Sequence, residues 1–405
     1  LSSRLGEQDS CLNLNNTYQP FLPFYRFEPI DQLLPMLSAS TCVAVVDERY
    51  TGESENASTV NKSTEKIAEK STASTSCEPV FAPQSKPLIL QGSELYMQRY
   101  WQYEVQLASK INSMTGRATT LDVAQGQALL AELFATHESK GSLAKNSLAK
   151  NSAQDQQAAP IDWQQVAVCL AASQNVSVIT GGPGTGKTTT VIRLMALLQG
   201  LARHTHKKLQ IKLAAPTGKA AARLSQSISA AMGKLPTALQ ADLPSQCSTI
   251  HRLLGSIANS PYFRFNAQHP LHLDVLIVDE ASMVDLPLMS KLFAALPAHA
   301  KIILLGDKDQ LASVEAGSVL SDICAAALNF SPTVYDQPPP YSDEALRVIK
   351  DLCQIDLQVS TPNKAPISNS LALLHKSYRF SEKSGIGRLA RAINSGKLAP
   401  SKALF

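Results

Sequence analysis

The stretch that decides the fold of this chain is Gly181-Gly182-Pro183-Gly184-Thr185-Gly186-Lys187-Thr188. It matches G-x-x-x-x-G-K-[ST], a pattern whose glycines let backbone N–H groups turn inward around the phosphates of a nucleotide. The β-branched residues of Val176–Thr180 predict a short buried strand before the loop. Apolar residues at helical spacing predict a helix from Thr188 to Leu198 after it. This order of strand, loop and helix predicts an α/β fold with a phosphate site at a helix N-terminus.

Two side chains of the loop have predicted tasks of their own. Lys187 is expected to reach the β- and γ-phosphates of ATP, and the hydroxyl of Thr188 is expected to hold Mg²⁺. A glycine turn that merely begins a helix is the alternative, which the flanking strand and helix disfavour. The nucleotide-binding set predicted for this site consists of Gln164, Gly181, Gly182, Pro183, Gly184, Thr185, Gly186, Lys187, Thr188 and Thr189.

Composition limits the class of protein. The 405 residues leave room for two or three domains, and the net charge of +4 permits a nucleic-acid partner without requiring one. The seven cysteines show no C-x-x-C spacing, which predicts reduced thiols of a cytoplasmic protein rather than disulfides. The sequence contains no signal peptide and no apolar run that could span a membrane. Because the first residue is Leu1 rather than Met, the chain is expected to be a fragment.

Patterning divides the chain into segments. Residues 1–138 are predicted to form a mainly helical N-terminal domain with a disordered insertion at 51–77, which is dominated by Ser, Thr, Glu, Lys and Ala. The remaining segments are a linker at 139–160, an ordered domain at 161–330, an irregular Pro-rich insertion at 331–366, and the start of a further ordered part at 367–405.

The segment 161–330 alternates between apolar strands and helical patterns. The predicted strands are Val176–Thr180, Leu209–Ala214, Val275–Val278 and Ile302–Leu305. Such alternation predicts a parallel sheet with helices on both faces, and ligands of such sheets bind beyond the carboxyl ends of the strands.

Two acidic residues end one of these strands. Asp279 is predicted to hold Mg²⁺ through its water shell, because small hard cations prefer oxygen ligands. Glu280 is predicted to orient or deprotonate a water that attacks the γ-phosphate. A solvated acidic pair at a strand end is the alternative, and the phosphate loop upstream disfavours it.

Three further polar residues are ambiguous when taken alone. The amide of Gln164 matches the donor and acceptor of adenine N6 and N7, but taken alone a polar residue at an exposed helix start is the favoured interpretation. Gln310, after the strand at 302–305, is either a sensor of the γ-phosphate or part of an ordinary turn. Arg379 is either a surface residue or an arginine that reaches the γ-phosphate when two domains close.

Another polar group follows the strand at 209–214. Backbone N–H groups, a hydroxyl and an ammonium group there could bind the phosphates of a nucleic-acid strand, although taken alone an ordinary strand-to-helix turn is the favoured interpretation. The DNA-binding candidates are Pro216, Thr217, Gly218 and Lys219, together with Thr249 and His251.

Six stretches then occur in a fixed order between residues 163 and 396. They are Gly-Gly-Pro-Gly-Thr-Gly-Lys-Thr-Thr-Thr, Ala-Pro-Thr-Gly-Lys-Ala-Ala-Ala-Arg-Leu, Ser-Thr-Ile-His-Arg-Leu-Leu-Gly, Asp-Glu-Ala-Ser-Met-Val-Asp, Leu-Leu-Gly-Asp-Lys-Asp-Gln-Leu-Ala-Ser-Val-Glu-Ala-Gly and Lys-Ser-Tyr-Arg-Phe. As an ordered string they resemble the RecD helicase subunit of the bacterial RecBCD enzyme (exodeoxyribonuclease V, alpha chain), which is a superfamily 1 helicase.

The resemblance implies ATP-driven movement along single-stranded DNA in the 5′-to-3′ direction, with RecB and RecC as partners. It implies a RecA-like first motor domain at 161–330, a second that begins within 367–405, and an N-terminal domain that contacts RecC. It also implies that Gln164 contacts adenine, that Gln310 and Arg379 sense the γ-phosphate, and that the DNA path follows the candidates after residues 214 and 248.

Two later motifs of the family's second motor domain do not occur before Phe405. One resembles Thr-x-His-Lys-x-Gln-Gly, and the other holds an Arg in a Thr-Arg-Ala segment. The chain is therefore expected to end inside that domain. Two alternatives stay open at this point: a free-standing helicase of the same superfamily, and a nucleotide-gated structural subunit that binds ATP and partners without motor activity.

Overall fold

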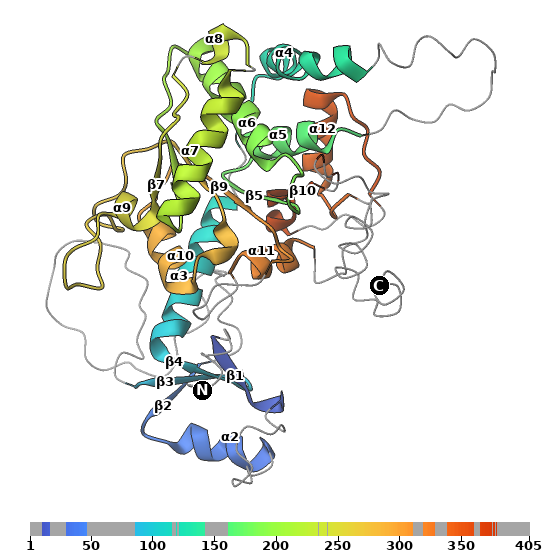
Figure 1. Cartoon of the computed structure of the whole chain (residues 1–405). Coiled ribbons are helices and arrows are strands. Elements are labelled where there is room, and N and C mark those ends of the chain that lie inside the picture. Colours follow the sequence, from blue (N-terminus) through green and yellow to red (C-terminus); the bar gives the residue numbers. More distant parts are fainter. Residues whose placement is uncertain are drawn as a thin grey trace, which may run out of the picture. The chain divides into compact units, whose positions relative to one another are not determined.

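The computed structural model describes residues 10–16, 30–46, 86–115, 119, 121–141, 161–233, 235–240, 242–310, 319–328, 338–359, 365–374, 376 and 378. The chain divides into two compact units, Leu1–Ser109 and Lys110–Phe405 (Figure 1). The predicted domain boundary at residue 138 differs from this division by a whole helix. The predicted insertion at 51–77 and the predicted linker beyond Gly141 lie outside the described residues.

The first unit is built around a four-stranded sheet of order β1-β4-β3-β2. Its elements are β1 (Cys11–Asn13), the 3₁₀ helix η1 (Leu14–Asn16), α2 (Ile30–Ala39), β2 (Val43–Val46), β3 (Leu88–Gln91), β4 (Glu94–Met97) and the first part of α3 (Gln98–Thr115). Strands β3 and β4 form an antiparallel hairpin, and Gly92 turns the chain between them with a φ of 58°. Alternate residues fill two apolar clusters, one on each face of the sheet.

The prediction of a mainly helical region at 1–138 holds by the extent of α2, α3 and α4, but it missed this sheet. Helices are present, but strands of three or four residues organise the first unit. Their alternation is too short to stand out beside the long helical pattern of α3. Two aromatic residues of this stretch serve packing. Tyr96 and Trp101 are buried in one of the clusters, and Nε1 of Trp101 donates to Oε1 of Gln91 at 2.9 Å.

The second unit contains a six-stranded parallel sheet of order β10-β5-β9-β8-β6-β7. Its strands are β5 (Val176–Thr180), β6 (Ile211–Ala215), β7 (Cys247–Thr249), β8 (Val275–Val278), β9 (Lys301–Gly306) and β10 (Leu371–Leu373). The four strands predicted from the sequence are all present, two of them with the predicted bounds. The predicted α/β fold with a parallel sheet is thereby confirmed.

Helices cover both faces of this sheet (Figure 1). The helices of the unit are α4 (Val123–Gly141), α5 (Trp163–Ser173), α6 (Lys187–His204), α7 (Gly218–Met232), α8 (Thr237–Gln240), α9 (Ile250–Leu254), η2 (Ala281–Met283), α10 (Leu286–Ala294), α11 (Val319–Ala327), α12 (Asp343–Cys353) and η3 (Pro366–Ser370). Helices α4, α5, α6 and α12 share one apolar core with one face of the sheet. Because Leu130, Leu133 and Phe134 lie in that core, α4 belongs to the second unit.

Two predictions for the C-terminal part are wrong. The segment 331–366 is not only an irregular insertion, because α12 packs Ile349 and Leu352 into the core and Tyr341 is fully buried. Strand β10 does not begin a separate domain, because Leu371 and Leu373 pair with Val178 and Thr180 of the first sheet. The residues after Tyr378 lie outside the described part of the chain.

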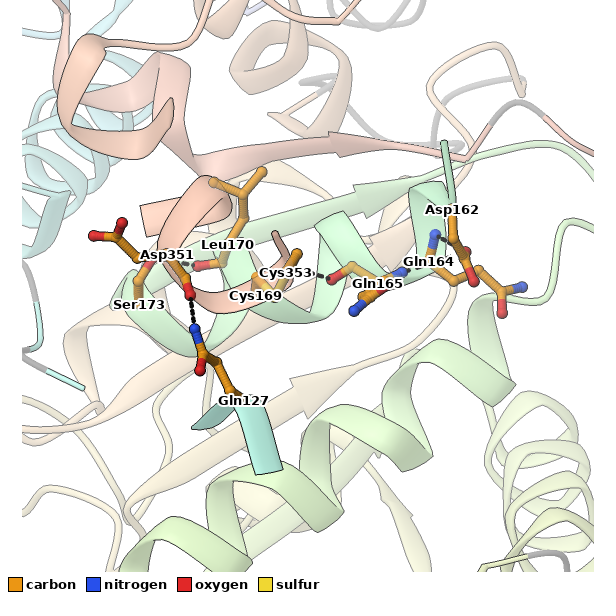
Figure 2. The surroundings of a disulfide bond; sticks show 9 residues. All are labelled: Gln127, Asp162, Gln164, Gln165, Cys169, Leu170, Ser173, Asp351 and Cys353. Atoms are coloured by element: carbon orange, nitrogen blue, oxygen red, sulfur yellow. Dashed lines mark hydrogen bonds between the residues drawn. A yellow bond between two sulfur atoms is a disulfide. The ribbon is translucent and has the colours of Figure 1, made fainter. Parts of the chain in front are cut away.

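The prediction that all seven cysteines are reduced is also wrong. A disulfide joins Cys169 in α5 to Cys353 in α12 (Figure 2). Nearby, Nε2 of Gln127 in α4 donates to the carbonyl of Asp351 at 2.6 Å, so that α4, α5 and α12 are tied together. Local cysteine spacing could not predict this pair, because its two cysteines lie 184 residues apart in the sequence. Within the described residues, no helix is both long and apolar enough to cross a membrane.

Candidate nucleotide site

The loop between β5 and α6 has the backbone that its glycines predict. Gly184 and Gly186 have φ angles of 79° and 86°, which residues with side chains rarely adopt. Gly186 is the N-cap residue of α6, and a Cβ atom there would collide with Nε2 of Gln164. Residue 186 therefore has to be glycine for two reasons, the conformation of its backbone and the side chain packed against it.

Lys187 turns its ammonium group into this loop. Its Nζ donates to the carbonyls of Gly181 and Gly182, the second at 3.3 Å, and Oγ1 of Thr185 donates to Gly182 at 2.9 Å. Lys187 is also the first residue of α6, where the partial positive charge of a helix N-terminus disfavours a cation. The loop thus concentrates positive charge and N–H groups at one point, as an anion site does.

The acidic pair follows β8, whose residues are fully buried. The backbone N–H of Asp279 donates to the carbonyl of Ala214 in β6 at 2.9 Å. Burial raises the pKa of the Asp279 carboxyl, and the nearby positive charges of Lys187 and Arg223 oppose that rise. Glu280 has a positive φ of 51°, an uncommon conformation that turns the chain sharply into η2. Asp279 therefore lies within electrostatic range of Lys187 in the phosphate loop.

These positions suit a magnesium ion that is shared with a nucleotide. Thr188 supplies a hydroxyl from the first turn of α6, and Asp279 supplies a carboxylate from the end of β8. Among the described residues, no group of three or more His, Cys, Asp or Glu side chains could hold a metal. Mg²⁺ fits such a site, because it keeps several waters and takes its other ligands from one or two protein groups and phosphates.

The loop after β9 joins the same edge of the sheet. Gly306 accepts from the backbone N–H of Gly181 at 3.3 Å, and the backbone N–H of Lys308 donates to Oγ1 of Thr180 at 2.9 Å. Gln310 is exposed just beyond this turn, and its backbone N–H donates to the carbonyl of Asp307 at 3.2 Å. The predicted sensor therefore follows a turn that is hydrogen-bonded to the end of β5.

Gln164 is buried, so the alternative of an exposed helix start is wrong. Asp162 caps α5 by accepting from the backbone N–H groups of Gln164 and Gln165 (Figure 2). Only 6% of Gln164 is exposed. Its Nε2 donates to the carbonyl of Thr185 at 3.2 Å, and its Oε1 accepts from Nη1 of Arg193 at 2.9 Å. The predicted adenine-binding amide is thus bonded to the phosphate loop itself.

Sequence reasoning missed Arg193 altogether. This arginine is 5% exposed on α6, and Val191, Ile192, Leu194 and Met195 around it are buried as well. The sequence does contain a signal for it, because Arg193 is a charged residue within an otherwise apolar helical segment. A buried charge needs a partner, so this position could have been predicted to interact with polar groups.

The DNA-binding candidates lie at the ends of β6 and β7, at the opposite side of the sheet from β10. Thr217 caps α7 by accepting from the backbone N–H of Ala220, and Thr249 caps α9 by accepting from that of Arg252, both at 3.2 Å. The exposed candidates are Thr217, Gly218, Lys219 and His251, whereas Pro216 and Thr249 are half-buried. These hydroxyls hold helix starts, and the groups beside them face solvent.

The described chain ends next to the phosphate loop. The backbone N–H of Tyr378 donates to the carbonyl of Gly184 at 2.8 Å. Arg379, the predicted second-domain arginine, lies outside the described residues.

Comparison with known proteins agrees with this geometry. Residues 164–316 match the family model of an AAA domain. The RecBCD enzyme subunit RecD of Haemophilus influenzae is 39% identical over 80% of this chain and 46% of that protein. The chain is RecD-like. The RecD-like sequence is also 31% identical to the subunit RecD of Buchnera aphidicola, over 79% of this chain and 48% of that protein.

A second kind of relative matches over a shorter stretch. The ATP-dependent RecD2 DNA helicase of Deinococcus radiodurans is 41% identical over 38% of this chain and 19% of that protein. The RecD-like chain spans about half the length of the curated RecD subunits it matches, 46% and 48% for the two above. Its AAA domain is of a nucleotide-binding P-loop class, which agrees with the loop geometry.

Proposed function

We propose that this chain is the ATP-hydrolysing motor part of a DNA helicase subunit that assembles with RecB- and RecC-type partners at DNA ends. One observation carries the proposal: the loops after β5, β8 and β9 meet at one edge of one sheet. They bring together Lys187, the Asp279–Glu280 pair and the turn before Gln310. A structural subunit that did not hydrolyse ATP would have no use for a carboxylate pair beside a phosphate loop.

Hydrolysis requires an exchange of partners at Lys187. Its ammonium group leaves the carbonyls of Gly181 and Gly182 and donates to phosphate oxygens, which form stronger charge-assisted hydrogen bonds. Glu280 orients the attacking water and accepts its proton. Mg²⁺, held by Thr188 and Asp279, would neutralise charge on the phosphates. Gln310 and Arg379 are proposed to sense the γ-phosphate.

DNA is proposed to run past the ends of β6 and β7. Thr217, Gly218 and Lys219 supply exposed donors there, which suit a phosphate backbone rather than base edges. The 5′-to-3′ direction, the RecB and RecC partners and a bacterial cytoplasmic location rest on the resemblance to RecD. Contact with adenine through Gln164 is likewise proposed. Its amide nitrogen has two N–H donors, so one can serve adenine while the other keeps the bond to Thr185.

The substitution Lys187→Gln tests the proposal. In an assembly with RecB- and RecC-type subunits, we expect it to lower ATP hydrolysis by this chain by roughly 100-fold or more while assembly is kept. Lys207→Gln, an exposed lysine after α6, is the matched control and should change neither property. Wild-type rates of hydrolysis and strand movement in the Lys187→Gln assembly would overturn the motor proposal in favour of a structural subunit.

A further inference from the structure

Helix α6 carries a charged side chain on its buried face. Arg193 is 5% exposed and lies one and a half turns after the phosphate loop, among the apolar residues that α6 packs against α4 and α5. Burial disfavours its charged form and lowers its pKa, although an arginine stays protonated in proteins. A cation in such a place is expected only where neighbouring groups stabilise it.

Three neighbours stabilise this guanidinium group. Its Nη1 donates to Oε1 of Gln164 at 2.9 Å. Its Cζ lies 4.2 Å from the centre of the Phe134 ring of α4, which is a close cation–π contact. Asp162, the N-cap residue of α5, adds an opposite charge that favours the protonated arginine. Arg193 thus connects α4, α6 and the start of α5 behind the phosphate loop.

The bond to Arg193 decides which way the amide of Gln164 faces. Arginine has donors and no acceptor, so it can meet the amide oxygen but not the amide nitrogen. A flipped amide would set N–H groups against N–H groups at Arg193 and an oxygen against the carbonyl of Thr185. With the oxygen held by Arg193, Nε2 points at the carbonyl of Thr185, 3.2 Å away, and packs against Gly186.

We propose that Arg193 is a positioning residue that fixes the amide of Gln164 against the phosphate loop, so that nucleotide affinity depends on a side chain behind the loop. This inference rests on the proposed nucleotide site. Arg193 acts through Gln164, which holds Thr185 and Gly186, the two residues immediately before Lys187. Losing Arg193 frees the amide to rotate and loosens the loop, which raises the entropic cost of ordering it around phosphates.

Arg193→Met, with Gln164→Leu and the double variant, tests this coupling in the full chain. The probe is a fluorescent ATP analogue with Mg²⁺. We expect Arg193→Met to raise its Kd about tenfold, the scale of one lost hydrogen bond to a charged group. Because Arg193 acts through Gln164, the double variant should bind no more weakly than Gln164→Leu alone. Arg193→Lys, which keeps a donor and the charge, should restore part of the affinity.

Two controls separate positioning from general damage. Arg203→Met removes an arginine of the same helix that pairs with Asp242 at 2.9 Å at the surface, and its Kd should equal that of the wild type. Each variant is measured below its own melting temperature, as followed by circular dichroism. Additive losses in the double variant, or an unchanged Kd in a folded Arg193→Met, would overturn the proposal.

A measurement without nucleotide keeps the inference distinct from the proposed function. Amide hydrogen exchange in residues 184–190 should be faster in Arg193→Met and in Gln164→Leu, by the same factor, and unchanged in Arg203→Met. If the wild-type chain failed to bind the ATP analogue, the proposed function would fail, while exchange would still decide the role of Arg193. Equal exchange in Arg193→Met and the wild type would overturn that role even if ATP binds.

Discussion

Two lysines occupy opposite ends of the six-stranded sheet, and both donate to backbone carbonyls. Lys187, beyond the carboxyl end of β5, donates to Gly181 and Gly182. Lys301, the first residue of β9, donates to the carbonyls of Ala172 at 3.0 Å and Gln174 at 2.9 Å, and to Oγ1 of Thr119 at 2.8 Å. The same chemical group therefore makes similar bonds in two very different electrostatic settings.

Helix polarity explains the difference. Lys301 lies at the C-terminal end of α5, where the free carbonyls and the negative end of the helix dipole favour a cation. Lys187 begins α6, where the positive end of a dipole disfavours one. Lys301 is satisfied within the protein, whereas Lys187 gains when an anion arrives. Helix α5 spans both settings, because Gln164 near its start contacts the phosphate loop and its last turn meets Lys301.

The matched substitutions Lys187→Met and Lys301→Met give the largest contrast. We expect Lys187→Met to reduce ATP hydrolysis by roughly 100-fold or more, because phosphate charge loses its main partner. Its melting temperature should stay the same or rise, since a disfavoured cation is removed. Lys301→Met should instead lower the free energy of unfolding by about 2 kcal/mol, because it leaves carbonyls at the end of α5 without donors. Steady-state ATPase and thermal melts measure both.

The opposite pattern, with hydrolysis lost in Lys301→Met or stability lost in Lys187→Met, would contradict the functional role of Lys187 and the structural role of Lys301. If Lys301→Met lost hydrolysis in a fully folded protein, the amino end of the sheet would have to take part in function. If Lys187→Met melted several degrees lower, its bonds to Gly181 and Gly182 would be structural.

Substitutions of the glycines at the starts of α6 and α7 should differ in their effect on stability, by less than the two lysine substitutions do. Gly186→Ala adds a methyl group at a positive φ and against the amide of Gln164, so it should cost about 1–3 kcal/mol of stability and weaken ATP binding. Gly218→Ala, at the first position of α7, meets no atom within 4 Å and should leave the free energy of unfolding within about 0.5 kcal/mol of the wild type. Chemical denaturation of both variants compares them directly. Equal stability would show that the loop can adapt to a side chain at residue 186.

Local chemistry explains why the phosphate loop and the strands around it could be predicted from the sequence. Three features can be predicted from residues only a few positions apart in the sequence: the glycine loop, the buried strands and the Asp279–Glu280 pair. Because the carboxyl ends of parallel strands lie at the same edge of a sheet, these local predictions also place the loops together. Whether each of these residues has its proposed role stays a prediction for the experiments above.

Distant partners explain what was missed. Strand β10 has three residues, and its partner β5 lies almost two hundred positions earlier. In α12 the local signals were present: Ser342 caps the helix, and Ala345, Ile349 and Leu352 recur at helical spacing. The preceding run Pro338-Pro339-Pro340 favoured an irregular segment over a helix. The sequence also does not indicate that Tyr341 donates to the carbonyl of Leu371 at 2.9 Å. Arg193 was missed because Phe134 and Gln164 are brought to it only by packing.

The pH dependence of stability gives the finest test of the setting of Lys301. Burial lowers the pKa of Lys301 to about 8, below the value of about 10.4 for a free lysine. Between those values the unfolded chain binds a proton that the folded chain lacks, so the contribution of Lys301 to stability rises with pH across this window and is constant below it. The neutral amine keeps N–H donors for the carbonyls of Ala172 and Gln174, so its contacts survive the loss of the proton.

The total slope is not informative, because burial raises the pKa of the Cys247 and Cys324 thiols to about 12, which lowers stability over the same range of pH. The informative quantity is therefore the difference in free energy of unfolding between the wild type and Lys301→Met. We expect that difference to grow in favour of the wild type by up to roughly 1 kcal/mol per pH unit from pH 8 to pH 10. A flat line would mean that the end of α5 holds the ammonium group of Lys301 charged across this range, and that helix polarity outweighs burial.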